Sequence, residues 1–106
     1  MIGNVAIVDR INLIQGQDLV HRWDVPAGDT LPAGTTVTLY MYSHNFSETL
    51  GIWPSIDVDT SGASFFIEAD DLEPIPAGAR FRVYVVYPDA PKPRLVWILG
   101  TVSRQG

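Results

Sequence analysis

Oxygen-bearing side chains gather in one stretch, DVDTSGASFFIE at residues 57–68, at the spacing of a calcium-binding EF-hand loop. Positions 1, 3, 5 and 12 of such a loop would be filled by Asp57, Asp59, Ser61 and Glu68. Gly62 would stand at position 6, where the loop turns sharply. Carboxylate and hydroxyl oxygens in this pattern suit a hard cation such as Ca²⁺. The same letters also suit a strand, a tight turn and a second strand.

The residues around this stretch decide between the two interpretations. An EF-hand loop needs a helix on each side, but strand-forming residues flank this one, and Pro54 lies inside the would-be entering helix. We therefore predict a β-hairpin that turns at 60–62, with no metal and no other cofactor. The alternative is a calcium ion held by Asp57, Asp59, Ser61 and Glu68.

The two histidines, His21 and His44, are the remaining candidates for catalysis. A catalytic histidine needs a nucleophile and an orienting acid beside it. Ser43 and His44 are adjacent, so on a strand they would point to opposite faces. His21 alternates with apolar residues, as a histidine of a core strand does. The sequence has no nucleophile elbow, phosphate-binding glycine loop or pair of metal-binding histidines. We predict that the protein is not an enzyme.

Length, charge and cysteine content limit the classes of protein further. A chain of 106 residues is expected to form one domain, 1–106, and without cysteine it has no disulfides. The net charge of −5 argues against nucleic acid or an anionic membrane as a partner. No apolar run reaches the roughly 20 residues of a membrane span, and residues 1–17 lack the plan of a signal peptide. We expect a soluble chain made in a cytoplasm.

Short apolar runs separated by glycine and proline predict strands throughout the chain. The runs rich in Val, Ile, Thr, Tyr, Phe and Trp lie near 4–8, 10–15, 18–25, 35–43, 50–58, 63–69, 79–87 and 94–103. Pro-Ala-Gly turns at 26–28, 32–34 and 76–78 and a proline-rich connection at 88–93 join some of them, and Asp70–Glu73 is expected to form one helical turn. This pattern predicts an immunoglobulin-like antiparallel β-sandwich of seven to eight strands.

Two segments echo one another, LPAGTTVTLYMY at 31–42 and IPAGARFRVYVV at 75–86, and each predicts a turn followed by a long strand. Alternation along the strands assigns one apolar set to the core: Val37, Leu39, Met41, Phe81, Val83 and Val85. We expect the two strands to be neighbours in one sheet. Their outer face then gathers a candidate interface: Tyr40, Tyr42, Arg80, Arg82 and Tyr84. Tyrosine and arginine dominate binding energy at interfaces, although they also suit any solvent-facing strand.

The three tryptophans are a second set of candidate binding residues, because exposed indole rings bind sugars. Trp23 and Trp97 lie in alternating or wholly apolar runs and are expected in the core. Trp53, between Gly51 and Pro54, is the candidate for an exposed sugar platform.

The order of these features resembles the small immunoglobulin-like β-sandwich domains of tailed-phage virion proteins, particularly in phages of actinobacteria and in the N-terminal domains of baseplate upper proteins. Gly16-Gln17-Asp18 leads into the strand with Trp23. The Pro-Ala-Gly turns at 32–34 and 76–78 lead into the strands at 35–42 and 79–87. The ending at 99–104 is similar to the close of such domains. The resemblance covers nearly the whole chain and brings no catalytic residues with it.

The resemblance implies a structural accessory protein of a phage virion, made in the host cytoplasm, either a capsid decoration subunit or a small tail-associated subunit. Its expected partners are other virion proteins, the major capsid or tail subunits. Many copies are expected in each particle, and neither nucleic acid nor a membrane is an expected partner. The chain ends at Gly106, where the sandwich is expected to end, and this favours a free-standing subunit. The alternative is a carbohydrate-binding or adhesion module that recognises the host surface.

Overall fold

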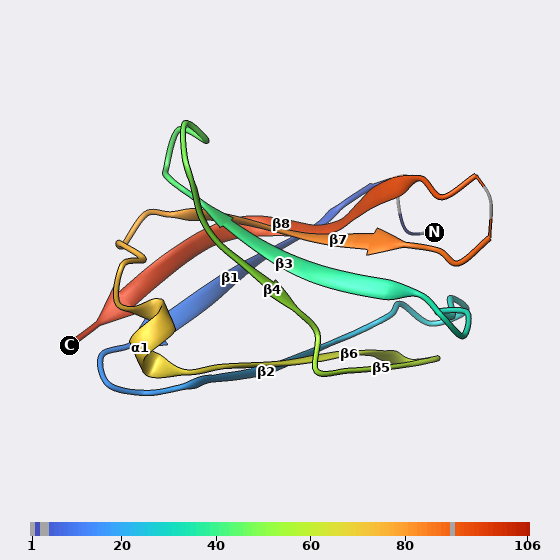
Figure 1. Cartoon of the computed structure of the whole chain (residues 1–106), viewed down its shortest axis with the longest axis horizontal. Helices are drawn as coiled ribbons and strands as arrows, with labels where there is room; N and C mark the ends of the chain where they lie inside the picture. Colours follow the sequence, from blue (N-terminus) through green and yellow to red (C-terminus); the bar gives the residue numbers. More distant parts are fainter. Residues whose placement is uncertain (1, 3–4, 90) are drawn as a thin grey trace.

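The computed structural model describes residues 2, 5–89 and 91–106, which form eight strands and one helical turn (Figure 1). In chain order the elements are β1 (Ile7–Ile14), β2 (Leu19–Asp24), β3 (Thr36–Tyr42), β4 (Thr49–Pro54), β5 (Asp57–Asp59), β6 (Gly62–Ile67), α1 (Ala69–Leu72), β7 (Arg80–Val86) and β8 (Arg94–Gln105). Within the described residues, no helix is long and apolar enough to cross a membrane.

The strands form two sheets that pack face to face, with the order β1-β8-β7-β3-β4 in one and β2-β6-β5 in the other (Figure 1). This is the strand arrangement of an immunoglobulin-like sandwich, so the predicted fold class is confirmed. One pairing departs from the antiparallel prediction, because β1 runs parallel to β8. Where antibody domains join their two sheets by a disulfide, the Trp23 ring of β2 stacks on Phe81 of β7 at 5.9 Å.

Most of the predicted strands are observed, with two differences. The runs predicted at 4–8 and 10–15 form one continuous strand, β1, and residue 4 lies outside the described residues. The run predicted at 50–58 divides into β4 and β5 because the chain changes sheets between them. Ser55 N donates to the Val37 carbonyl of the first sheet, and Ile56 N donates to the Ser64 carbonyl of the second. The helical turn expected near 70–73 is confirmed as α1.

The echoed segments build the same turn before two neighbouring strands. Thr35 N donates to the Pro32 carbonyl and Ala79 N to the Pro76 carbonyl, at 3.1 and 3.3 Å. Gly34 and Gly78 have φ angles of 88° and 87°, the left-handed conformation that this turn requires and that glycine adopts without strain. The turns therefore launch β3 and β7 in a similar way, and the two strands pair antiparallel over their whole length.

The core lies between the sheets, and the alternation of the strands predicts it well. All six residues assigned to it on β3 and β7 are fully buried. Trp97 and Trp23 are also buried, as predicted. Phe65 of β6 packs against the Trp23 ring at 5.6 Å, which extends the aromatic packing within the three-stranded sheet. The core therefore fixes which face of β3 and β7 looks outward.

Candidate docking interface

The stretch at 57–68 is a hairpin, as predicted. β5 and β6 pair antiparallel, with Asp57 opposite Ser64 and Asp59 opposite Gly62. The Asp59 carboxylate closes the turn by accepting hydrogen bonds from Ser61 N at 2.8 Å, Ser61 Oγ at 2.7 Å and Gly62 N at 3.0 Å. The side chain that resembled a calcium ligand thus organises the backbone of the turn.

A cation of the protein already occupies the position next to Asp59. The Arg22 guanidinium lies 3.0 Å from the Asp59 carboxylate and 2.7 Å from that of Asp24. Its hydrogen bond, followed by those from Ser61, holds the pKa of Asp59 well below its usual range. Glu68 follows β6 and lies four residues beyond the partner of Asp57, about 13 Å along the strand. The hairpin therefore does not gather the four proposed ligands.

The described residues show no close group of three or more His, Cys, Asp and Glu side chains that could hold a metal ion. The two histidines lie on different elements. His21 is half-buried on β2, where its ring meets the edge of Trp23 at 4.3 Å. His44 is exposed in the loop between β3 and β4. The absence of catalysis stays a prediction.

The predicted interface residues do share one face. Tyr40 lies opposite Arg82 and Tyr42 opposite Arg80 in the β3–β7 pair, and Tyr84 lies opposite Thr38. Because their neighbours in sequence fill the core, these side chains lie on the outer face of the five-stranded sheet. The sequence pattern therefore brings all five residues together on the side away from β2, β5 and β6.

The three tyrosines form one aromatic cluster. The Tyr40 ring meets the edge of Tyr84 at 5.0 Å and stacks with Tyr42 at 6.1 Å. The hydroxyl groups of Tyr42 and Tyr84 are hydrogen-bonded at 3.2 Å. Contacts of this kind fix the rings in place, so little side-chain freedom is left to lose on binding.

Two further side chains complete the cluster, and the strand alternation predicts neither of them. The Arg94 guanidinium of β8 lies 3.9 Å above the Tyr84 ring, and Arg82 lies 4.7 Å above the ring of Phe46. Phe46 comes from the loop after β3 and packs against Tyr42 at 5.3 Å. We call the whole set the tyrosine–arginine face: Tyr40, Tyr42, Phe46, Arg80, Arg82, Tyr84 and Arg94.

The members of this face differ in what they offer a partner. Tyr84 is only 6% exposed, because Arg94 and the other tyrosines cover it, so it supports the face from below. Phe46 and Arg80 are exposed, and Tyr40, Tyr42 and Arg82 are half-exposed. The accessible surface of the face is thus a rim of arginine and phenylalanine around two tyrosine rings.

Phe46 adopts an unusual backbone conformation, with φ at 61°, the left-handed region that a bulky residue rarely adopts. The loop holds it there through Ser43, whose carbonyl accepts from Phe46 N at 2.9 Å and whose hydroxyl accepts from Glu48 N at 3.1 Å. Asn45 Oδ1 accepts from Ser47 N at 3.1 Å. These bonds stabilise a conformation that carries an aromatic ring over Arg82.

The two bonded tyrosines shift each other's acidity in opposite directions. Burial, together with the hydrogen bond to Tyr84, raises the pKa of Tyr42 to about 12. Burial acts upward on Tyr84 as well. However, its hydrogen bonds to Tyr42 and Arg82 and the charges of Arg82 and Arg94 hold the pKa of Tyr84 below its ordinary value. The positive charges of the face therefore act directly on its central hydroxyl.

The candidate sugar platform, Trp53, is not a flat exposed ring. The residue is half-buried on β4, packs against the core and lies opposite Leu39. A Cβ atom at Gly51 would clash with the Trp53 ring, so the glycine lets the indole fold back over the strand. Trp53 therefore covers its own sheet edge.

The sequence of this chain matches a known protein family. The family model described as an LtfC-like, beta-sandwich domain matches residues 6–105. The chain belongs to this family. The match spans β1 to β8 and agrees with the two-sheet fold. A search of curated proteins found no match.

Proposed function

We propose that this LtfC-like chain is a structural accessory subunit of a phage virion, either a capsid decoration subunit or a small tail-associated subunit. In this proposal it acts by docking to neighbouring virion proteins and has no catalytic role. The membership of the LtfC-like family supports a phage-associated β-sandwich domain. The resemblance to sandwich domains of tailed-phage virion proteins supports the accessory role.

The tyrosine–arginine face is the observation that carries the proposal. It joins aromatic rings and guanidinium groups, the groups that interfaces enrich, on the outside of a five-stranded sheet. Its side chains are held by ring contacts and by the bond between Tyr42 and Tyr84, so docking does not need to order them first. The alternative, a carbohydrate-binding module, depended on an exposed Trp53, and that ring is folded onto its own strand.

The test replaces two accessible members of the face, Tyr40→Ala with Arg82→Ala, and measures how much of the variant enters phage particles. Removing a central ring and a guanidinium should reduce incorporation at least tenfold, the effect of losing about 1.4 kcal/mol or more at a hot spot. A matched control, Thr30→Ala with Lys92→Ala, also removes one cation, from exposed loops that are not part of the face. The control should incorporate normally.

The thermal midpoint of both variants shows whether they fold. Normal incorporation of a folded Tyr40→Ala, Arg82→Ala variant would contradict docking through this face. Equal loss in the Thr30→Ala, Lys92→Ala control would contradict it as well.

A further inference from the structure

Positive charge is concentrated on the outside of the five-stranded sheet. Four of the seven basic residues lie there, from β1, β7 and β8: Arg10, Arg80, Arg82 and Arg94. Asp9 is the carboxylate of these strands, and it turns inward, because it accepts a hydrogen bond from Trp23 Nε1 at 2.9 Å. An acidic protein thus has one face on which arginines are not balanced by carboxylates of the same strands.

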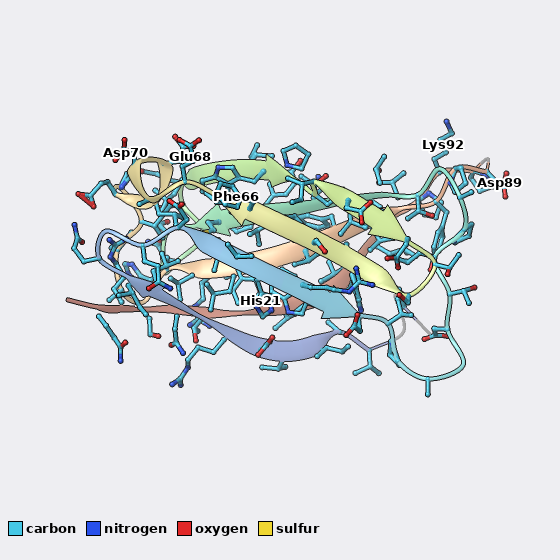
Figure 2. The ribbon with its side chains drawn as sticks, turned by 90° about the horizontal axis from the view of Figure 1, so that it is seen from below. His21, Phe66, Glu68, Asp70, Asp89 and Lys92 are labelled. Atoms are coloured by element: carbon cyan, nitrogen blue, oxygen red, sulfur yellow. The ribbon has the colours of Figure 1, made fainter. Side chains whose placement is uncertain are left out.

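The outside of the three-stranded sheet, which faces the viewer in Figure 2 with Phe66 and Glu68 labelled, carries mainly carboxylates. Asp24, Asp57 and Asp59 are exposed on β2 and β5, and Glu68 follows β6. Arg22 is the basic residue of these strands, and it is already paired with Asp24 and Asp59. We call this surface the acidic face, made up of Val20, Arg22, Asp24, Asp57, Asp59, Phe66 and Glu68.

Each of the two faces also carries exposed apolar side chains. On the acidic face, Val20 and Phe66 lie directly opposite each other in the β2–β6 pair and are 72% and 46% exposed. Beside the tyrosine–arginine face, Ile52 of β4 lies opposite Tyr40 and is 53% exposed. Each face therefore combines apolar area with a net charge of one sign, as docking surfaces do.

We propose that copies of this chain stack on one another, with the tyrosine–arginine face of one copy on the acidic face of the next. Opposite charges favour this contact, whereas like charges oppose stacking of either face on itself.

The two faces lie on opposite sides of one sandwich, so the contact is head-to-tail and repeats. A repeating contact of this kind produces a ring or a filament, which is a suitable plan for a subunit present in many copies. The inference rests on the proposed function, because it names a second copy as a partner of the tyrosine–arginine face.

Charge reversal on each face separately gives a decisive test in purified protein. The first variant, Arg10→Glu with Arg80→Glu, removes the net positive charge from the outside of the five-stranded sheet. The second, Asp57→Lys with Glu68→Lys, changes the net charge of the acidic face from negative to positive. All four positions are exposed. Light scattering and analytical ultracentrifugation at low salt then measure association of the wild type, of each variant and of their equimolar mixture, and thermal midpoints confirm folding.

The wild type should associate at low salt, and its association constant should fall at least tenfold as the ionic strength rises from about 0.05 M to about 0.5 M. Each variant alone should be monomeric, and the mixture should associate again. A monomeric wild type, association of either variant alone or no recovery in the mixture would each overturn the stacking.

The association experiment and the particle-incorporation experiment distinguish stacking from docking to a different virion protein. A monomeric wild type, combined with lost particle incorporation of the Tyr40→Ala, Arg82→Ala variant, would refute stacking and leave docking to a different virion protein. Association of copies in solution with normal incorporation of that variant would support stacking and refute docking to the particle through this face.

Discussion

At the scale of single residues, the tyrosine–arginine face has a hydrogen bond between two hydroxyls at its centre. Tyr42 and Tyr84 lie on paired neighbouring strands, and their hydroxyls meet at 3.2 Å. Arg82 donates a hydrogen bond to the Tyr84 hydroxyl, and Arg94 lies over the Tyr84 ring. The arrangement raises the pKa of Tyr42 to about 12 and lowers that of Tyr84. A group whose pKa is higher in the folded state than in the unfolded state stabilises the fold at low pH. This stabilisation is lost as the pH rises through the pKa of the folded state.

The first prediction follows from that shift. In the wild type, Tyr42 should contribute stability that is fully present below pH 10 and is lost as the pH rises to about 12. Tyr42→Phe should remove the highest step from the ultraviolet titration of tyrosinate and should make the fall in thermal midpoint over this range shallower. Tyr87→Phe, half-buried outside the cluster, is the matched control and should leave the highest step in place. Persistence of that step in Tyr42→Phe would contradict the assignment.

At the scale of elements, the hairpin of β5 and β6 gives the acidic residues at 57–59 a structural role. Asp59 bonds to the turn and to Arg22, and this guanidinium takes the place that a cation would need. Removal of divalent metal with a chelator should therefore leave the thermal midpoint unchanged, and added Ca²⁺ should not raise it. A rise with Ca²⁺ that disappears in Asp57→Ala and Glu68→Ala variants would show a metal site instead.

Alternation along β3 and β7 is sufficient to predict their core residues and their outer face, because the side-chain period of a strand is two. Pro-Ala-Gly turns predict where both strands begin. The sequence does not predict that Arg94 reaches Tyr84, since a shift in the β7–β8 register between Val83 and Tyr84 sets that contact. Phe46 is missed because its position depends on a left-handed backbone in a loop without glycine.

At the scale of the whole molecule, the sandwich separates charge between its two outer faces, and the net charge of −5 conceals this separation. Arginines lie on the outer face of one sheet and carboxylates on the outer face of the other. Outward positions can hold charged residues because they take no part in packing the core. Composition argued against anionic partners for the chain as a whole. The arginine-rich face nevertheless suits a partner with acidic groups.

Docking through the tyrosine–arginine face is tested most directly by hydroxyl-radical footprinting of the free protein and of the protein in phage particles. Docking predicts that Tyr40, Tyr42 and Phe46 react several-fold more slowly in the particle, because aromatic rings at the centre of an interface lose contact with solvent. Trp53, half-buried on the edge strand, is the internal reference and should change little. Equal reactivity of the three rings in the free and assembled protein would contradict the account.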